Sequence, residues 1–261
     1  MRLLALLLTI ATPALPAIRW FNNLGQASAL AKETGRPMMV EFWADWCQPC
    51  KVMDATVYSD ESVAEMVNRK VVPVRIHFDV QREVARQFNT TAIPYLAFTN
   101  SHGTELMHHR GILGVQDFKA VVNAIPSDVR ELNRLDQELR RNPDDFDSLL
   151  AMASTLRAAG FLQNVLGYYE RALKRAKPPD AREFVLRELG RTALDLKDGK
   201  RAVRAFERAA KDFPQSPHRP ETLLRLAQAY KLNGQEDRAR EQIAALKAEY
   251  PHSEAARRSK P

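Results

Sequence analysis

Cysteine is scarce in this 261-residue sequence, which contains only Cys47 and Cys50. A secreted protein that is held together by disulfides normally has more cysteines, at wider spacing. Two cysteines that lie three positions apart cannot tie distant parts of the chain together. The scarcity therefore disfavours a structural disulfide framework and favours a chemically reactive pair.

Long apolar runs are also missing, apart from one near the start. Residues 3–11 (LLALLLTIA) are too few to cross a bilayer, which needs roughly 20 apolar residues, but they match the core of a secretory signal. Small residues follow, so cleavage is expected after Ala14 or Ala17, and residues 1–17 are interpreted as a signal peptide. The alternative is an uncleaved membrane anchor that extends to Ile18. Export would place the protein in an oxidising compartment such as a bacterial periplasm.

No nucleic-acid-binding motif accompanies the net charge of +7. Residues 127–261 hold 27 of the 39 basic and 21 of the 32 acidic residues, so almost all of the excess lies there. The arginines of this part are interleaved with acids along helical faces, which is typical of a solvated surface. We therefore expect a mildly basic helical region and no nucleic-acid partner.

Residues 18–126 alternate between helical and strand patterns. A short apolar run at 38–43 suits a buried central strand, and a Ser-His-Gly turn after residue 100 joins two strand patterns as a hairpin. The predicted helices span 24–34, 47–57, 60–68, 80–88 and 115–124, and the predicted strands span 38–43, 71–78, 95–99 and 104–109. This order predicts an α/β domain with a mixed central sheet and helices on both faces.

Strand patterns vanish after this domain, and Ala, Leu, Arg and Glu dominate. An amphipathic linker helix is predicted within 127–145, with an apolar stripe along one face. An internal repeat follows, because Pro214 and Pro251 lie 37 residues apart and each comes just after a helix. The stripe is Val129, Leu132, Leu135 and Leu139; the repeated helix cores are Ala202, Phe206, Ala209 and Ala239, Ile243, Leu246.

Three helix pairs result, at 146–179, 183–216 and 220–253, and they resemble tetratricopeptide repeats. The usual period of about 34 residues is lengthened here by short spacers. The first pair departs from the pattern, since Val165 stands where its second helix should carry a small residue. The resemblance implies an all-α repeat domain over 146–261, whose stacked helices form a groove for a protein or peptide ligand.

The segment around the two cysteines, Glu41-Phe-Trp-Ala-Asp-Trp-Cys-Gln-Pro-Cys-Lys, resembles the active site of thioredoxins. A Thr-Ala-Ile-Pro segment whose proline lies 44 residues after Cys50 adds to the resemblance, which covers residues 18–126. It implies a thioredoxin fold and a thiol–disulfide oxidoreductase that needs no cofactor.

The spacing of the pair has its own chemical logic. Cysteines at positions i and i+3 of a helix's first turn face the same side, so their sulfurs can bond. Cys47 lies where unpaired backbone N–H groups stabilise a thiolate, which makes it the candidate nucleophile, and we expect it to be exposed. Cys50 would then resolve the mixed disulfide with a client. Because the helix should carry Cys50 inward, its thiol needs a base.

Glu41 is the candidate proton acceptor, as an acid in an apolar strand six residues before Cys47. The thioredoxin resemblance implies a buried carboxyl at this position; the alternative is a carboxylate that faces solvent at the end of the sheet. Arg75 falls where the family has a lysine, and we expect it to pair with Glu41 and hold it ionised.

Five further residues are expected to support the reaction. By resemblance, Pro94 should follow a cis peptide bond and face the cysteines, with an ordinary trans proline as the alternative. The Ile93 backbone would pair with an extended client segment. Trp46 is expected to form a flat apolar contact beside the reactive sulfur. Within the motif, Pro49 and the neutral Gln48 predict a reducing potential near −270 mV, about that of thioredoxin.

The working hypothesis is an exported reductase of protein disulfides. A membrane thiol-reductant transporter would supply its electrons, and the repeats would recruit disulfide-bearing clients or a partner. Two alternatives stay open: a repeat-based adaptor with a dispensable thioredoxin-like domain, and a copper-handling thiol protein. We predict no metal site at His108 and His109, because adjacent strand residues point to opposite faces.

Overall fold

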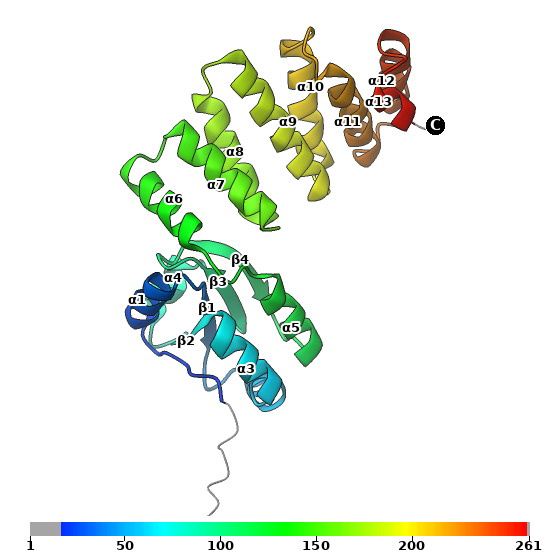
Figure 1. The fold of residues 1–261 in the computed structure, drawn as a ribbon. Helices are drawn as coiled ribbons and strands as arrows, with labels where there is room; N and C mark the ends of the chain where they lie inside the picture. Colours follow the sequence, from blue (N-terminus) through cyan, green and yellow to red (C-terminus); the bar gives the residue numbers. More distant parts are fainter. Residues whose placement is uncertain (1–16, 260–261) are drawn as a thin grey trace, which may run out of the picture. The chain divides into compact units, whose positions relative to one another are not determined.

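The computed structural model describes residues 17–259 (Figure 1). The proposed signal sequence falls on residues 1–16, outside the described part. The chain divides into two compact units. The first holds the described residues up to Ala97 together with His108–Ser127, and the second holds Phe98–Met107 together with the described residues from Asp128 onward.

The first unit is built on a four-stranded sheet of strand order β2-β1-β3-β4. The strands are β1 (Met38–Trp43), β2 (Val72–His77), β3 (Tyr95–Thr99) and β4 (Glu105–Arg110). β1 and β2 are parallel, in a register that places Glu41 opposite Arg75. All of β1 except Trp43 is buried, as its largely apolar sequence predicts for a central strand.

The helices of this unit are α1 (Leu24–Thr34), α2 (Gln48–Met53), α3 (Glu61–Lys70), α4 (Arg82–Gln87) and α5 (Val115–Ala124), with a π-helical turn, η1 (Asp54–Tyr58), directly after α2. The predicted helix over 47–57 therefore begins one residue later and changes its hydrogen-bonding pattern halfway. α3 begins one residue after the start of its predicted range, because Asp60 is its N-cap and the Asp60 side chain accepts from the Val63 N–H at 3.0 Å.

The two faces of β1 serve different purposes. Met38, Val40 and Phe42 point into a core that α1 and α4 close with Ala27, Ala31, Ala85 and Phe88. Successive strand residues point to opposite faces, so Glu41 points to the other side, where α2 and η1 lie. The alternation thus places one carboxyl beneath the cysteine-bearing helix. Helices cover both faces of the sheet, α1 and α4 on one and α3 and α5 on the other (Figure 1).

The second unit begins with α6 (Arg130–Arg141), whose predicted apolar stripe is buried. Asp136 on this helix is a buried hub. Its Oδ1 accepts from Thr104 Oγ1 at 2.7 Å, and its Oδ2 lies 3.0 Å from His102 Nδ1 and 2.8 Å from Arg140 Nε. Asn133 Oδ1 also accepts from the Ser101 N–H at 2.9 Å. The turn of the hairpin is therefore bonded to α6.

Three antiparallel helix pairs follow, in the places that the internal repeat predicts. They are α7 (Phe146–Ala158) with α8 (Leu162–Arg175), α9 (Pro179–Asp195) with α10 (Gly199–Asp212), and α11 (Arg219–Leu232) with α12 (Glu236–Glu249). A short helix that the sequence did not predict, α13 (Glu254–Arg258), packs against α11 and α12. None of the helices in the described part is long and apolar enough to cross a membrane.

Candidate functional site

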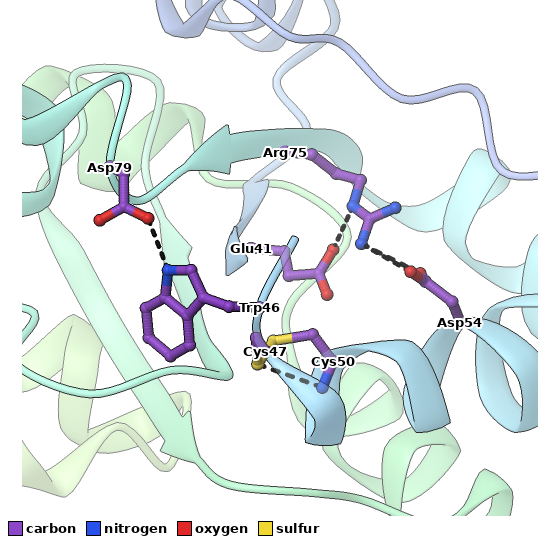
Figure 2. The surroundings of a disulfide bond; sticks show 7 residues. All are labelled: Glu41, Trp46, Cys47, Cys50, Asp54, Arg75 and Asp79. Carbon is purple, nitrogen blue, oxygen red and sulfur yellow. Dashed lines mark hydrogen bonds and ion pairs between the residues drawn. A yellow bond between two sulfur atoms is a disulfide. The ribbon is translucent and has the colours of Figure 1, made fainter. Parts of the chain in front are cut away.

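The two cysteines form a disulfide at the start of α2 (Figure 2). Cys47 is the N-cap residue of that helix, and its Sγ accepts a hydrogen bond from the Cys50 backbone N–H at 3.2 Å. A negative charge on this sulfur would strengthen the bond, because charge-assisted hydrogen bonds are stronger than neutral ones. The local backbone is therefore arranged to favour a thiolate at Cys47.

The sequence suggested an exposed Cys47, and the oxidised structure corrects this. Cys47 is only 1% exposed and Cys50 is fully buried. The Cys47 sulfur is bonded to that of Cys50. The two cysteines and Ala44 form a cluster against which Trp43, Phe78 and Ile93 pack. Attack on a client therefore needs the reduced state, in which the bond between the two sulfurs is open.

Glu41 is fully buried, so the alternative of a solvent-facing carboxylate is wrong. Its carboxyl group lies between the Arg75 guanidinium and the cysteine pair (Figure 2). Glu41 Oε2 is 2.7 Å from Arg75 Nε, which is the expected ion pair. The parallel register of β1 and β2 makes this pair, since it places the two residues side by side.

Arg75 is held on several sides. Its Nη2 lies 3.0 Å from Asp54 Oδ1, at the start of η1. Its guanidinium carbon lies 4.7 Å from the ring centre of Trp43, 5.2 Å from that of Trp20 and 5.9 Å from that of Tyr58. Cation–π attraction at such distances adds to the two ion pairs. The cation is therefore fixed above Glu41 and shared between two carboxylates.

Burial and this sharing determine the proton affinity of Glu41. Desolvation, helped by the negative charge of Asp54, raises the pKa of Glu41 to about 7 against the opposing charge of Arg75. The sequence predicted that Arg75 would hold Glu41 ionised; near neutral pH the carboxyl is instead only partly ionised, because desolvation outweighs the ion pair. The pKa of the buried Tyr58 is also raised, by desolvation and then by Glu41.

The remaining motif residues face solvent. Gln48 and Pro49 are exposed in the first turn of α2. Trp46 is 63% exposed, and its Nε1 donates to Asp79 Oδ2 at 2.6 Å, which fixes the indole at the surface (Figure 2). The Trp46 ring, next to Cys47 in the sequence, therefore offers an accessible apolar surface whose orientation is fixed by Asp79.

Ile93 and Pro94 lie in the loop before β3. The peptide bond between them is cis, and Ile93 packs against the two cysteines. The Gly111 N–H donates to Pro94 O at 3.0 Å, which places the exposed Ile112 next to this loop. The structure therefore brings Ile93 to the cysteine pair and leaves apolar side chains accessible around the loop.

Three residues of the site were missed from the sequence: Asp54, Tyr58 and Trp20. One signal for Asp54 was available, since it lies four residues after Cys50 and so on the same side of the helix. Nothing in the local sequence indicated Trp20, which reaches Arg75 only because residues near Phe21 run beside β2, bonded to Pro73 O and the Arg75 N–H.

Metal ligands do not gather in the described part of the chain. No group of three or more His, Cys, Asp and Glu side chains that could hold an ion is found among residues 17–259. His108 instead stacks on Tyr95, with ring centres 5.2 Å apart.

Two sequence families match this chain. Residues 19–101 match a family described as thioredoxin-like, and residues 188–260 match a tetratricopeptide repeat family. The chain therefore carries a thioredoxin-like domain and a tetratricopeptide repeat region, as the sequence predicted.

Curated relatives match the first of these regions. The chain is 29% identical over 101 residues to the thiol:disulfide interchange protein DsbD of Campylobacter jejuni strain RM1221, covering 38% of this chain and 18% of that protein. It is 30% identical over 109 residues to DsbD of Salmonella typhimurium, covering 40% of this chain and 19% of that protein. The chain thus spans about a fifth of the length of these relatives.

Solved structures overlap with the same part. A thioredoxin from Thermus thermophilus superposes with a TM-score of 0.38 at 25% identity, covering 41% of this chain and 85% of that one. A DsbH oxidoreductase gives a TM-score of 0.39 at 18% identity, covering 45% of this chain and 90% of that one.

Proposed function

We propose that this protein is an exported thiol–disulfide oxidoreductase that reduces disulfides in client proteins. The observation that carries the proposal is the Cys47–Cys50 disulfide at the N-cap of α2, with the carboxyl group of Glu41 buried beneath it. A structural disulfide has no need of a buried acid with a pKa near neutrality. The likeness of this region to proteins named for thiol:disulfide interchange supports the same conclusion.

The reaction uses both sulfurs of the reduced protein. The Cys47 thiolate attacks one sulfur of a client disulfide, which forms a mixed disulfide and releases the other client thiol. Glu41 takes the proton of the Cys50 thiol, and the resulting thiolate attacks Cys47 Sγ. The client leaves as a dithiol, and the enzyme keeps the new disulfide. Two electrons have passed to the client, and its two departing thiolates take up one proton from Glu41 and one from solvent, which replaces the proton that Cys47 lost on ionising.

The client would lie along the loop that contains Ile93. No hydrogen bond to the main chain of Ile93 is found among the described residues, so its N–H and C=O are open to an extended segment. Trp46 and Ile112, which are 63% and 52% exposed, supply apolar contacts on either side. Recognition through the main chain would admit clients of varied sequence.

The direction of electron flow rests on Gln48 and Pro49. Neither side chain can stabilise the reduced thiolate with an added positive charge, as a strongly oxidising protein requires. We expect a potential near about −270 mV, and a value above roughly −180 mV in a redox titration would overturn the reductase direction. In an oxidising compartment, a membrane thiol-reductant transporter would return the electrons.

Trapping tests the catalytic assignment. The Cys50→Ala variant cannot resolve the mixed disulfide, so it should hold clients covalently through Cys47, and they can be identified by mass spectrometry after reduction. The Cys47→Ala variant is the matched control and should trap few. Equal trapping by both variants would contradict the assignment of Cys47 as nucleophile. Sequencing the N-terminus of the mature protein tests export, since cleavage after Ala14 or Ala17 is expected.

The repeat region is proposed to recruit a client or partner. Stacked helix pairs present a continuous surface, and linking it to the thiol raises the thiol's effective concentration near a bound protein. This role is independent of the chemistry at Cys47 and can be tested separately.

A further inference from the structure

The last helix pair of the repeat region leaves an apolar groove open. A cavity of about 580 Å³ lies between α11, α12 and the C-terminal end of α13. Leu224, Ala227, Ala239, Ile243 and Ala244 provide its apolar lining. A face of a repeat that meets water is normally polar. An open apolar groove here therefore calls for an explanation.

The first two helix pairs show which kind of element packs on the equivalent face. In the first two pairs, the equivalent face is covered by the next helix along the chain, since α9 packs on α8 and α11 packs on α10 and α9. In the third pair, α13 takes that place but has only five residues, and it covers the end near Leu223 and Leu246. Beyond α13, no described residue covers the rest of this face, which is the surface that a full helix covers in the first two pairs.

At the edges of this groove, basic residues stand where the first two repeats have apolar ones. One repeat period of 37 residues relates Leu166, Val203 and Arg240, and another such series is Leu173, Ala210 and Lys247. In the first two pairs these positions are apolar and are buried or half-buried, whereas both cations of the third pair are exposed. The third pair thus keeps the small and apolar floor but surrounds it with cations.

Four basic side chains and one acid line the groove: Lys231, Arg240, Lys247, Arg258 and Glu236. Arg240 and Arg258 are paired, with Asp237 and with Glu221 respectively. No carboxylate of the described residues forms an ion pair with Lys231 or Lys247. Two cations at the groove are therefore available to an occupant.

We propose that this groove binds one amphipathic helix of a partner protein, with an apolar stripe of small and medium side chains flanked by Asp and Glu. The proposal rests on the recruiting role of the repeats and deepens it by naming the surface and the chemistry of the ligand. Ala227, Ala239 and Ala244 let a helix approach closely, and the interaxial distance of packed helices depends on such side chains.

Charge disfavours a two-fold dimer of this chain through the groove. In a two-fold dimer the same face meets itself, so the Lys231 and Lys247 of both copies would be brought together. Like charges in an interface are unfavourable, whereas acidic flanks would pair with these lysines. Charge complementarity therefore selects an acidic helix.

The test measures binding of a designed peptide to the full-length protein, with Cys47→Ser and Cys50→Ser introduced to prevent thiol exchange. The probe is a fluorescent helix of about four turns with Leu and Ala on one face and Glu on both flanks. A second probe has Lys in place of each Glu. Fluorescence anisotropy should show that the acidic probe binds at least about tenfold more tightly than the basic probe.

Charge reversal locates the site. The K231E/K247E variant should weaken binding of the acidic probe by at least about tenfold, whereas K200E/K211E, with the same net change on α10, should leave it within about twofold. Ala244→Gln, at an exposed position of the floor, should also weaken binding without a change in helicity by circular dichroism. Equal binding of both probes, no binding, equal loss in both reversals, or a dimer that Lys231 and Lys247 control would each overturn the proposal.

These measurements do not involve the thiols. A failure to bind the probe would leave disulfide reduction intact, and a failure to trap clients through Cys47 would leave the groove intact. The two proposals can therefore fail separately.

Discussion

Arg75 Nε and Glu41 Oε2 are 2.7 Å apart, but this close ion pair does not make Glu41 an ordinary acid. Desolvation of the buried carboxyl raises its pKa to about 7, and Asp54 competes for the same guanidinium. The carboxyl can therefore gain and lose a proton near neutral pH. That property suits a group that must take the proton of a buried thiol.

The first prediction concerns the pH dependence of the resolving step. The protein is labelled on Cys47 as a mixed disulfide with an aromatic thiol, and the release of that thiol by Cys50 is followed by absorbance. The rate should rise as pH increases through about 7, because Glu41 becomes ionised. In Glu41→Gln this dependence should vanish, and the rate at pH 8 should fall by about 10²-fold or more.

Glu41→Asp is the matched control for this measurement. It keeps an ionisable carboxyl in the same strand and should keep a rise in rate with pH. If Glu41→Gln shows the wild-type profile, Glu41 is not the proton acceptor of Cys50.

The second prediction concerns Asp54. Its negative charge raises the pKa of Glu41, and it holds one side of the Arg75 guanidinium. Asp54→Asn should lower the pKa of Glu41 for both reasons, so the midpoint of the rate profile should move to lower pH. The conservative variant Asp54→Glu should restore it. A midpoint that moves upward, or does not move, would show that Asp54 has no influence on the proton acceptor.

The third prediction concerns stability of the oxidised protein. The pKa of Glu41 is about 7 in the folded protein against an ordinary value of 4.5, so between these pH values the folded state binds more protons than the unfolded state. Stability from this group is complete below pH 4.5 and is lost as pH rises to about 7. The loss is about 3 kcal/mol, since each pKa unit corresponds to about 1.4 kcal/mol.

Guanidinium denaturation at pH 4.5 and pH 8 measures this loss. Glu41→Gln should lack it, so the stability difference between wild type and variant should change with pH in favour of the variant at pH 8. A difference that stays constant between the two pH values would contradict the raised pKa.

The fourth prediction concerns packing within the repeats. A Cβ on Gly190 would lie 2.6 Å from two ring carbons of Phe206, so Gly190→Ala should cost about 1–3 kcal/mol of stability. Gly167 is also inside a helix, but a Cβ there would meet nothing within 4 Å. Gly167→Ala should therefore stabilise by about 0.5–1 kcal/mol. Thermal unfolding of both variants gives the comparison, and equal effects would refute the close approach at Gly190.

Much of the fold could be predicted because local patterns and the final structure agree. The apolar run of β1 and the caps of α1 and α3 each specify an element by themselves. The period of 37 residues likewise located the three helix pairs. α13 was missed because five residues are too few to show a helical period.

The site was only partly predictable because its electrostatics depend on tertiary neighbours. Glu41 and Arg75 were paired from the sequence, but the balance between desolvation and attraction depends on how deeply the carboxyl is buried. Trp20 contributes through a chain segment that crosses to the edge of β2, which no local pattern reveals. The change from apolar residues to cations at Arg240 and Lys247 was present in the sequence, but its significance depended on the position of the groove.

The contacts of Asp136 determine where the chain can be cut to isolate the thioredoxin-like region. The turn at His102 and Thr104 belongs by sequence to the thioredoxin-like region, yet its polar groups are satisfied by α6. Cutting the chain at Pro126 would remove those partners and leave a frayed hairpin in the isolated domain. A cut after Arg141 would retain them, so excision of a well-behaved thioredoxin-like fragment should carry α6 along as part of its scaffold.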